Sequence, residues 1–205
     1  MARIYLVRHA ESVANTAGVY QGQTHDTDLS TLGRRQATAL VHRFANQQLD
    51  AIYVSPLKRA RQTAAALGPS MDEPALLETN HGAWEGLSKT AIQARWPDLY
   101  QTWLSHPSTV EFPLGEQFAV TAHRAVAWFE RVSATNRTIL AVTHSNIIMA
   151  LLTHLTAQSL DAMWRYAPQP TAVTLIESHS PAKIIYINDT THLRGLESDL
   201  SLHAI

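Results

Sequence analysis

Short apolar runs and helical patterns alternate along most of this chain. Residues 4–7 form an apolar run that predicts a buried strand, and residues 138–143, apolar and β-branched, give the clearest strand pattern in the sequence. Similar runs predict strands over 51–54, 171–177 and 184–188, and a brief extended segment over 75–77.

Between these runs, apolar side chains recur at the spacing of buried helix faces. Positions 37, 40, 41 and 44 are the clearest example, and Ser30 before them is the expected N-cap of that helix. Other helices are expected over 57–67, 88–95, 118–132 and 147–155, with shorter helical segments over 97–105 and 159–166. The segments 15–28, 70–74, 79–86 and 106–115 are expected to be loops, the last of them a candidate lid, and the tail after His192 shows no assignable pattern.

This alternation of strands and helices predicts an α/β fold. We expect a three-layer sandwich, with a mostly parallel sheet and helices on both of its faces. The last two strands, joined by residues 178–183, are expected to form an antiparallel edge. Because no repeat or linker divides the sequence, residues 1–205 are expected to fold as a single domain.

Composition narrows the possible functions. The chain is 45% hydrophobic and 16% charged, and its net charge of −1 comes with no basic stripe, so a nucleic-acid partner is not expected. No apolar run approaches the roughly 18 residues of a membrane span, and no leader pattern precedes the first strand. The chain has no cysteine, which excludes disulfides and thiolate metal sites and fits a cytoplasmic location.

Three predicted strands end in polar residues suited to binding an anion. The first strand runs into Arg8 and His9, and the clearest strand runs into His144. The second is followed by Ser55 and, near the start of the next helix, by Arg59. Parallel strands bring such ends to one edge of the sheet, where ligands bind. Two arginines and two histidines without a carboxylate cage favour phosphate over a metal ion.

The motifs around these residues can be compared, in their order along the chain, with those of known families. They are Arg8-His9-Ala10-Glu11 with Asn15, Ser55-Pro56-Leu57-Lys58-Arg59-Ala60 with Thr63-Ala64, Glu78 followed by Gly82 and Trp84-Glu85-Gly86, and Val142-Thr143-His144. Together they cover residues 4 to about 150 and resemble the histidine phosphatase superfamily, the cofactor-dependent phosphoglycerate mutase-like group. The length and the Trp84-Glu85-Gly86 loop look most like its small-molecule phosphatase branch, which includes broad-specificity and α-ribazole phosphatases.

The resemblance implies a phosphomonoesterase and a role for each reacting side chain. His9 would be the nucleophile that forms a phosphohistidine intermediate. Arg8, Arg59 and His144 would bind the phosphoryl oxygens and stabilise the transition state. Glu78 would protonate the leaving alkoxide and then take a proton from the attacking water.

Several further residues are candidates by the same resemblance. Asn15, Gln21 and Gly22 are expected to contact phosphate or substrate, although Asn15 also suits a helix or turn cap. Glu85 is the rival of Glu78 for the role of general acid. No metal or cofactor is implied, and the expected partners are a small phosphorylated substrate and inorganic phosphate as product.

The chain departs from the family pattern at two places. Ala10 stands where the family usually has glycine, and Ser145-Asn146 stands where it often has two. Neither change removes a reacting group, but both bear on the shape of the pocket floor and hence on the substrate. Histidines 25, 81, 106 and 179 are expected in loops, those at 25 and 81 in loops that could rim the pocket, and the five tryptophans are expected to serve packing.

Two other functions remain open at this point. A mutase of the same fold would return the phosphoryl group to its product, but such enzymes generally carry inserted segments, and this chain is short for them. A non-catalytic phospho-ligand binding module would need none of the reacting residues, and all of them are present.

Overall fold

The computed structural model describes residues 1–203 and folds them around a six-stranded sheet with the order β3-β2-β4-β1-β5-β6. The strands are β1 (Arg3–Arg8), β2 (Ala51–Val54), β3 (Met71–Asp72), β4 (Thr138–Thr143), β5 (Val173–Glu177) and β6 (Lys183–Asp189). The first four run parallel, whereas β5 and β6 are antiparallel and form one edge. The predicted α/β sheet with an antiparallel edge is confirmed.

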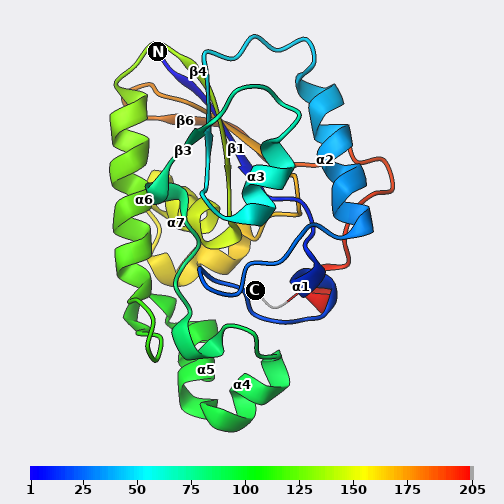
Figure 1. The fold of residues 1–205 in the computed structure, drawn as a ribbon. Helices are drawn as coiled ribbons and strands as arrows, with labels where there is room; N and C mark the ends of the chain where they lie inside the picture. The colour runs from blue at the N-terminus through cyan, green and yellow to red at the C-terminus, as the bar shows by residue number, and fades with distance from the viewer. Residues whose placement is uncertain (204–205) are drawn as a thin grey trace.

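Helices cover both faces of this sheet. The α-helices are α1 (Val13–Thr16), α2 (Thr31–Phe44), α3 (Lys58–Ala64), α4 (Lys89–Arg95), α5 (Pro97–Ser105), α6 (Phe118–Ser133) and α7 (Ser145–Leu155). Short 3-10 helices are η1 (Pro74–Leu76), η2 (Gly82–Trp84), η3 (Pro107–Thr109), η4 (Leu160–Tyr166) and η5 (Leu200–Leu202). Helices α6 and α7 lie on one side, α2 and α3 on the other, and α4 and α5 project beyond the sheet (Figure 1). None of the helices in residues 1–203 has both the length and the apolar character needed to cross a bilayer.

The strand β1 is buried on both faces, which explains why its sequence is continuously apolar. Ile4 and Leu6 pack into the cluster that contains Trp128 of α6. Tyr5 and Val7 point the other way, into the cluster beneath α2 and α3. Each such side chain removed from water contributes about 2 kcal/mol, so the strand before the polar Arg8-His9 pair is firmly anchored.

Helix α2 starts where the sequence predicts. Ser30 is its N-cap, and the Ser30 hydroxyl accepts a hydrogen bond from the backbone N–H of Gly33 at 2.9 Å. A Cβ at Gly33 would collide with the carbonyl of Glu11. The glycine therefore lets α2 pack directly against the loop that follows β1.

The segment predicted as extended over 75–77 is different in the structure. It forms the 3-10 helix η1, in which Pro74 fixes the first backbone torsion and Glu73 accepts a hydrogen bond from the N–H of Ala75 at 3.1 Å. The short strand β3 lies instead in the predicted loop 70–74. Local capping thus outweighed the apolar character of this segment.

The candidate lid over residues 106–115 is packed into the fold at Val110 and Phe112, whereas Leu114 near its end is 93% exposed. Val110 and Phe112 are each 1% exposed. The Phe112 ring meets those of Trp84 and Trp103 edge-on, with both centroids 5.1 Å away. Phe112 therefore links Trp84 of η2 to Trp103 of α5.

Candidate active site

The predicted strand ends meet at one edge of the sheet. Arg8 is paired with Thr143 in the parallel β1–β4 register, and the N–H of His9 donates to the carbonyl of Thr143 at 2.8 Å. Across β4, His144 Nε2 lies 2.7 Å from the hydroxyl of Ser55. A backbone hydrogen bond to β4 thus fixes His9, and a side-chain contact with Ser55 fixes the ring of His144.

His9 is buried and held as a neutral imidazole. Its Nδ1 lies 2.7 Å from the carbonyl oxygen of Ala10, and because a carbonyl only accepts, Nδ1 carries the proton. Burial, followed by the charges of Arg59 and Arg8, holds the pKa of His9 well below its ordinary value. The other nitrogen, Nε2, is therefore unprotonated and able to act as a nucleophile.

Arg8 is anchored through its two terminal nitrogens. Nη1 donates to the carbonyl of Pro168 at 2.8 Å, and Nη2 lies 3.3 Å from Nδ1 of His203. Its buried Nε has no hydrogen-bond partner among residues 1–203. Burial lowers the pKa of Arg8 to about 10, which leaves the guanidinium charged at neutral pH.

Arg59 is held in the same way on the opposite side of His9. Nη1 donates to Asp26 Oδ1 at 2.8 Å and Nη2 to the carbonyl of Gly22 at 3.0 Å. Its Nε is also buried without a partner in the described part of the chain. Two fixed guanidinium groups, each with an unused donor, suit a dianionic phosphoryl group.

His144 is fully buried behind His9. The two ring centroids are 5.1 Å apart, at an interplanar angle of 56°. With Nε2 bound to Ser55, the buried Nδ1 of His144 has no partner within residues 1–203. Burial and the charge of Arg59 hold the pKa of His144 well below its ordinary value. His144 is 0% exposed and is not among the residues that line the cavity, so it lies behind His9 rather than at the cavity surface.

Glu78 and Glu85 occupy different environments. Glu78 lines the site, and burial raises the pKa of its carboxyl although its Oε1 accepts a hydrogen bond from the N–H of Thr79 at 2.9 Å. Glu85 accepts from the N–H groups of Thr24 (2.7 Å) and His25 (2.8 Å). Burial alone would raise the pKa of Glu85, but the hydrogen bond from the Thr24 hydroxyl, followed by those from the N–H groups, lowers it. Glu78 is therefore suited to act as a general acid, whereas Glu85 holds the backbone of Thr24 and His25 in place.

The three weaker candidates lie around the site in different ways. Asn15 lines it while its Oδ1 accepts from the N–H of Ser12 at 3.0 Å, so it completes the capping box of α1, whose N-cap is Ser12. Gln21 lines it too, and its Nε2 donates to the Ser12 hydroxyl at 2.8 Å. Gly22 is not part of the lining; its carbonyl holds Arg59, and a Cβ there would collide with Glu85.

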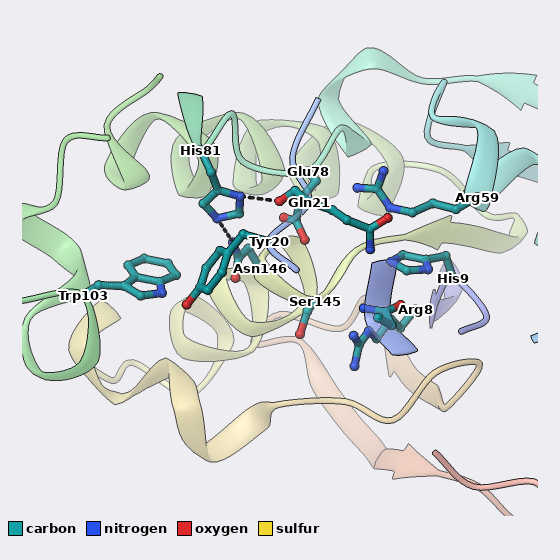
Figure 2. A pocket seen from close by; sticks show the side chains of 11 residues that line it. Arg8, His9, Tyr20, Gln21, Arg59, Glu78, His81, Trp103, Ser145 and Asn146 are labelled. Carbon is teal, nitrogen blue, oxygen red and sulfur yellow. Dashed lines mark hydrogen bonds between the residues drawn. The ribbon is translucent and has the colours of Figure 1, made fainter. Parts of the chain in front are cut away.

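The cavity between these groups has about 370 Å³ of space between its lining atoms, mouth included. Figure 2 shows Arg8, His9 and Arg59 at one end and Tyr20, His81 and Trp103 at the other. The lining comprises Arg8, His9, Asn15, Tyr20, Gln21, Arg59, Glu78, His81, Trp103, Ser145 and Asn146. One end of the cavity is therefore cationic, and the other end is neutral.

Sequence reasoning missed part of this lining. Trp103, expected to serve packing alone, lines the cavity, whereas His81, expected in a loop that could rim the pocket, is 4% exposed and does line it. Tyr20 lies in the long polar segment before α2 and carried no distinguishing pattern. Among residues 1–203, His, Cys, Asp and Glu form no group of three or more that could hold a metal ion.

Comparison with known proteins gives a consistent result. The sequence model of the histidine phosphatase superfamily (branch 1) matches residues 4–190. Phosphoserine phosphatase 1 of Hydrogenobacter thermophilus is 32% identical over 201 residues, 94% of this chain and 95% of that protein. A metal-independent phosphoserine phosphatase of Arabidopsis thaliana is 30% identical over 78% of this chain and 71% of its own length. The solved structure of a putative α-ribazole-5'-P phosphatase from Escherichia coli superimposes with a TM-score of 0.83 at 26% identity, covering 92% of this chain and 96% of the other.

Proposed function

We propose that this chain, which belongs to the histidine phosphatase superfamily, hydrolyses small phosphomonoesters by two successive transfers of the phosphoryl group, first to His9 and then to water. The proposal rests on the protonation state of His9. Its Nδ1 proton is fixed on the carbonyl of Ala10, so the unprotonated Nε2 is left between two anchored arginines.

In the first step, Nε2 of His9 attacks phosphorus, and the bond between phosphorus and the ester oxygen breaks. Glu78, whose pKa is raised by burial, gives its proton to the departing alkoxide. The unused Nε donors of Arg8 and Arg59 stabilise the charge on the phosphoryl oxygens during transfer. His144, beside His9, supplies a further polar contact through Nδ1.

In the second step, water attacks the phosphorus of the phosphohistidine. Glu78, now a carboxylate, takes the proton from that water, and the nitrogen–phosphorus bond breaks with its electron pair returning to Nε2 of His9. Inorganic phosphate leaves, and both residues regain their starting states. Among the weaker candidates, Asn15 and Gln21 are proposed to contact the substrate directly, and Gly22 to act through Arg59.

The substrate is proposed to be a small phosphorylated metabolite in the cytoplasm. The mostly enclosed cavity and its neutral polar end favour a compact alcohol over a polymer. Two similar proteins are named for the hydrolysis of phosphoserine, and we propose phosphoserine as the first substrate to test.

The test is a panel of small phosphate esters with the purified protein, with release of inorganic phosphate as the measurement. A phosphatase releases phosphate in proportion to the alcohol formed. A mutase would instead return the phosphoryl group to its product, and a binding module would leave every ester intact. Either of those two results would overturn the proposal.

A further inference from the structure

The end of the cavity away from the arginines has a polar group whose orientation the chain fixes. His81 Nδ1 lies 2.6 Å from the carbonyl oxygen of Gln21, so Nδ1 must carry the proton and donate it. Burial lowers the pKa of His81 to about 4, so the ring is neutral and its Nε2 is an acceptor. Figure 2 shows this chain of hydrogen bonds from Gln21 through His81 to Asn146.

Asn146 must therefore turn its amide nitrogen toward His81. Its Nδ2 lies 3.2 Å from His81 Nε2 and donates to the hydroxyl of Thr79 at 3.1 Å. A flipped amide would place two acceptors against each other at the first contact. The side-chain oxygen, Oδ1, has no hydrogen-bond partner among residues 1–203 and belongs to a residue that lines the cavity. This oxygen is an acceptor held ready for a bound molecule.

Ser145 adds a second unused group beside it. Ser145 is 2% exposed and also lines the cavity, and its hydroxyl oxygen has no partner in the described part of the chain. Both residues begin helix α7, directly after His144. A buried hydroxyl without a partner destabilises the folded protein, and a contact with a ligand would remove that cost.

The residues at the Asn146 end of the cavity determine which chemical group of a ligand can bind there. The cavity residues around Asn146 are His81, Tyr20, Trp103 and Ser145, none of which carries a positive charge at neutral pH. A carboxylate directed at Oδ1 would meet another acceptor. A protonated amine would meet an oxygen acceptor, a hydroxyl and aromatic rings, the surroundings that favour ammonium groups.

We propose that Asn146 Oδ1 and Ser145 Oγ bind an ammonium group on the alcohol part of the substrate, and that His81 is the positioning residue that keeps Oδ1 turned toward it. The inference rests on the proposed phosphatase activity and narrows its substrates to phosphorylated amino alcohols and amino acids. The pair that stands in place of two family glycines thus determines specificity.

The first test needs no variant. The wild-type protein is assayed with O-phosphoserine and with 3-phosphooxypropanoate, which differs only in lacking the amine. A hydrogen bond from a charged donor predicts a kcat/KM about tenfold to a hundredfold higher for phosphoserine. Equal values for the two esters, or a preference for the ester without the amine, would overturn the inference.

The second test changes the amide. In Asn146→Leu, kcat/KM for phosphoserine should fall about tenfold or more relative to that for 3-phosphooxypropanoate, mostly through KM, and His81→Phe should shift the same ratio in the same direction. Asn80→Ala is the matched control, because that amide caps the N–H of Gly82 outside the cavity and should leave the ratio unchanged. Equal losses on both esters in Asn146→Leu would make Asn146 merely structural and overturn the inference.

Nitrophenyl phosphate separates this inference from the proposed function. Wild-type turnover of that ester without any preference between the two alkyl esters overturns the ammonium subsite alone. Absence of turnover on all three esters overturns the phosphatase activity itself.

Discussion

Arg8 and His203 lie side by side although they are 195 positions apart in the sequence, with Arg8 Nη2 3.3 Å from His203 Nδ1. The other ring nitrogen of His203 is 3.6 Å from Glu11 Oε2, and that oxygen also accepts from the hydroxyl of Ser198 at 2.7 Å. The last described residues therefore reach back to the loop after β1, beside α1 (Figure 1). The end of the chain supports an arginine proposed to hold the phosphoryl group.

His203→Ala should weaken phosphate binding. Burial and the charge of Arg8 lower the pKa of His203 to about 4, so its neutral ring can accept from the guanidinium. Loss of that contact frees Nη2, and we expect kcat/KM to fall about tenfold, with a matching rise in the inhibition constant of inorganic phosphate. Steady-state kinetics with phosphate as competitor measure both quantities. His154→Ala, at an exposed position near the end of α7, is the control. Unchanged phosphate inhibition in His203→Ala would show that the contact does not position Arg8.

Substitutions at the two glutamates should have different consequences. Glu78→Gln removes the proton that the leaving group needs, and we expect a loss of about 10²–10⁴-fold in the turnover of an alkyl phosphate. Formation of phosphohistidine from a nitrophenyl ester should be nearly unaffected, because nitrophenolate departs without a proton. Glu85→Gln should weaken the hydrogen bonds to residues 23–25 and lower the melting temperature. A loss in Glu85→Gln that depends on the leaving group would assign the acid role to Glu85 instead.

The pH profile follows from two shifted groups. His9 must be unprotonated, and its pKa lies below the ordinary 6.5, so kcat/KM should not fall on the acid side until well below pH 6.5. Glu78 must be protonated, and its pKa lies above 4.5, so the alkaline limb starts above pH 4.5. After correction for the ionisation of the substrate phosphate, an alkyl ester should show both limbs. Glu78→Gln should abolish the alkaline limb, and persistence of that limb would contradict the assignment.

Catalysis is expected to proceed without a metal ion. The positive charge at the phosphate end comes from Arg8 and Arg59, each fixed by hydrogen bonds of 2.8 Å to 3.3 Å. Dialysis against a chelator should therefore leave kcat and KM unchanged. Complete loss of activity, restored by zinc or magnesium, would show that these residues do not supply the charge on their own.

The parts of the site that the sequence predicted are those set by the sheet. Arg8, His9 and His144 follow apolar strands directly, and parallel strands necessarily bring their carboxyl ends to one edge. Ser30 likewise predicted the start of α2 correctly, because N-capping depends only on adjacent residues. Where the controlling interactions were local or set by the sheet, the pattern was sufficient.

The remainder depends on contacts between distant segments. Trp103 lines the cavity because α5 packs its ring against Phe112. His203 reaches Arg8, not the cavity itself, because Glu11 holds the tail in place. No period or spacing in the sequence encodes either contact. His81 sits in a loop whose polar composition suggests exposure, yet the carbonyl of Gln21 and the amide of Asn146 bind both of its ring nitrogens and allow its burial.

The phosphohistidine on His9 is the central claim, and the most direct measurement is its capture. Wild-type protein, Glu78→Gln and His9→Ala are mixed with a labelled nitrophenyl phosphate and quenched in base, where phosphohistidine survives. We expect transient label on the wild type and accumulated label on Glu78→Gln, because its second step lacks a base, and none on His9→Ala. Mass spectrometry should place the label on the peptide that contains His9. Label of equal yield on His9→Ala, or hydrolysis by Glu78→Gln without any trapped label, would contradict the account.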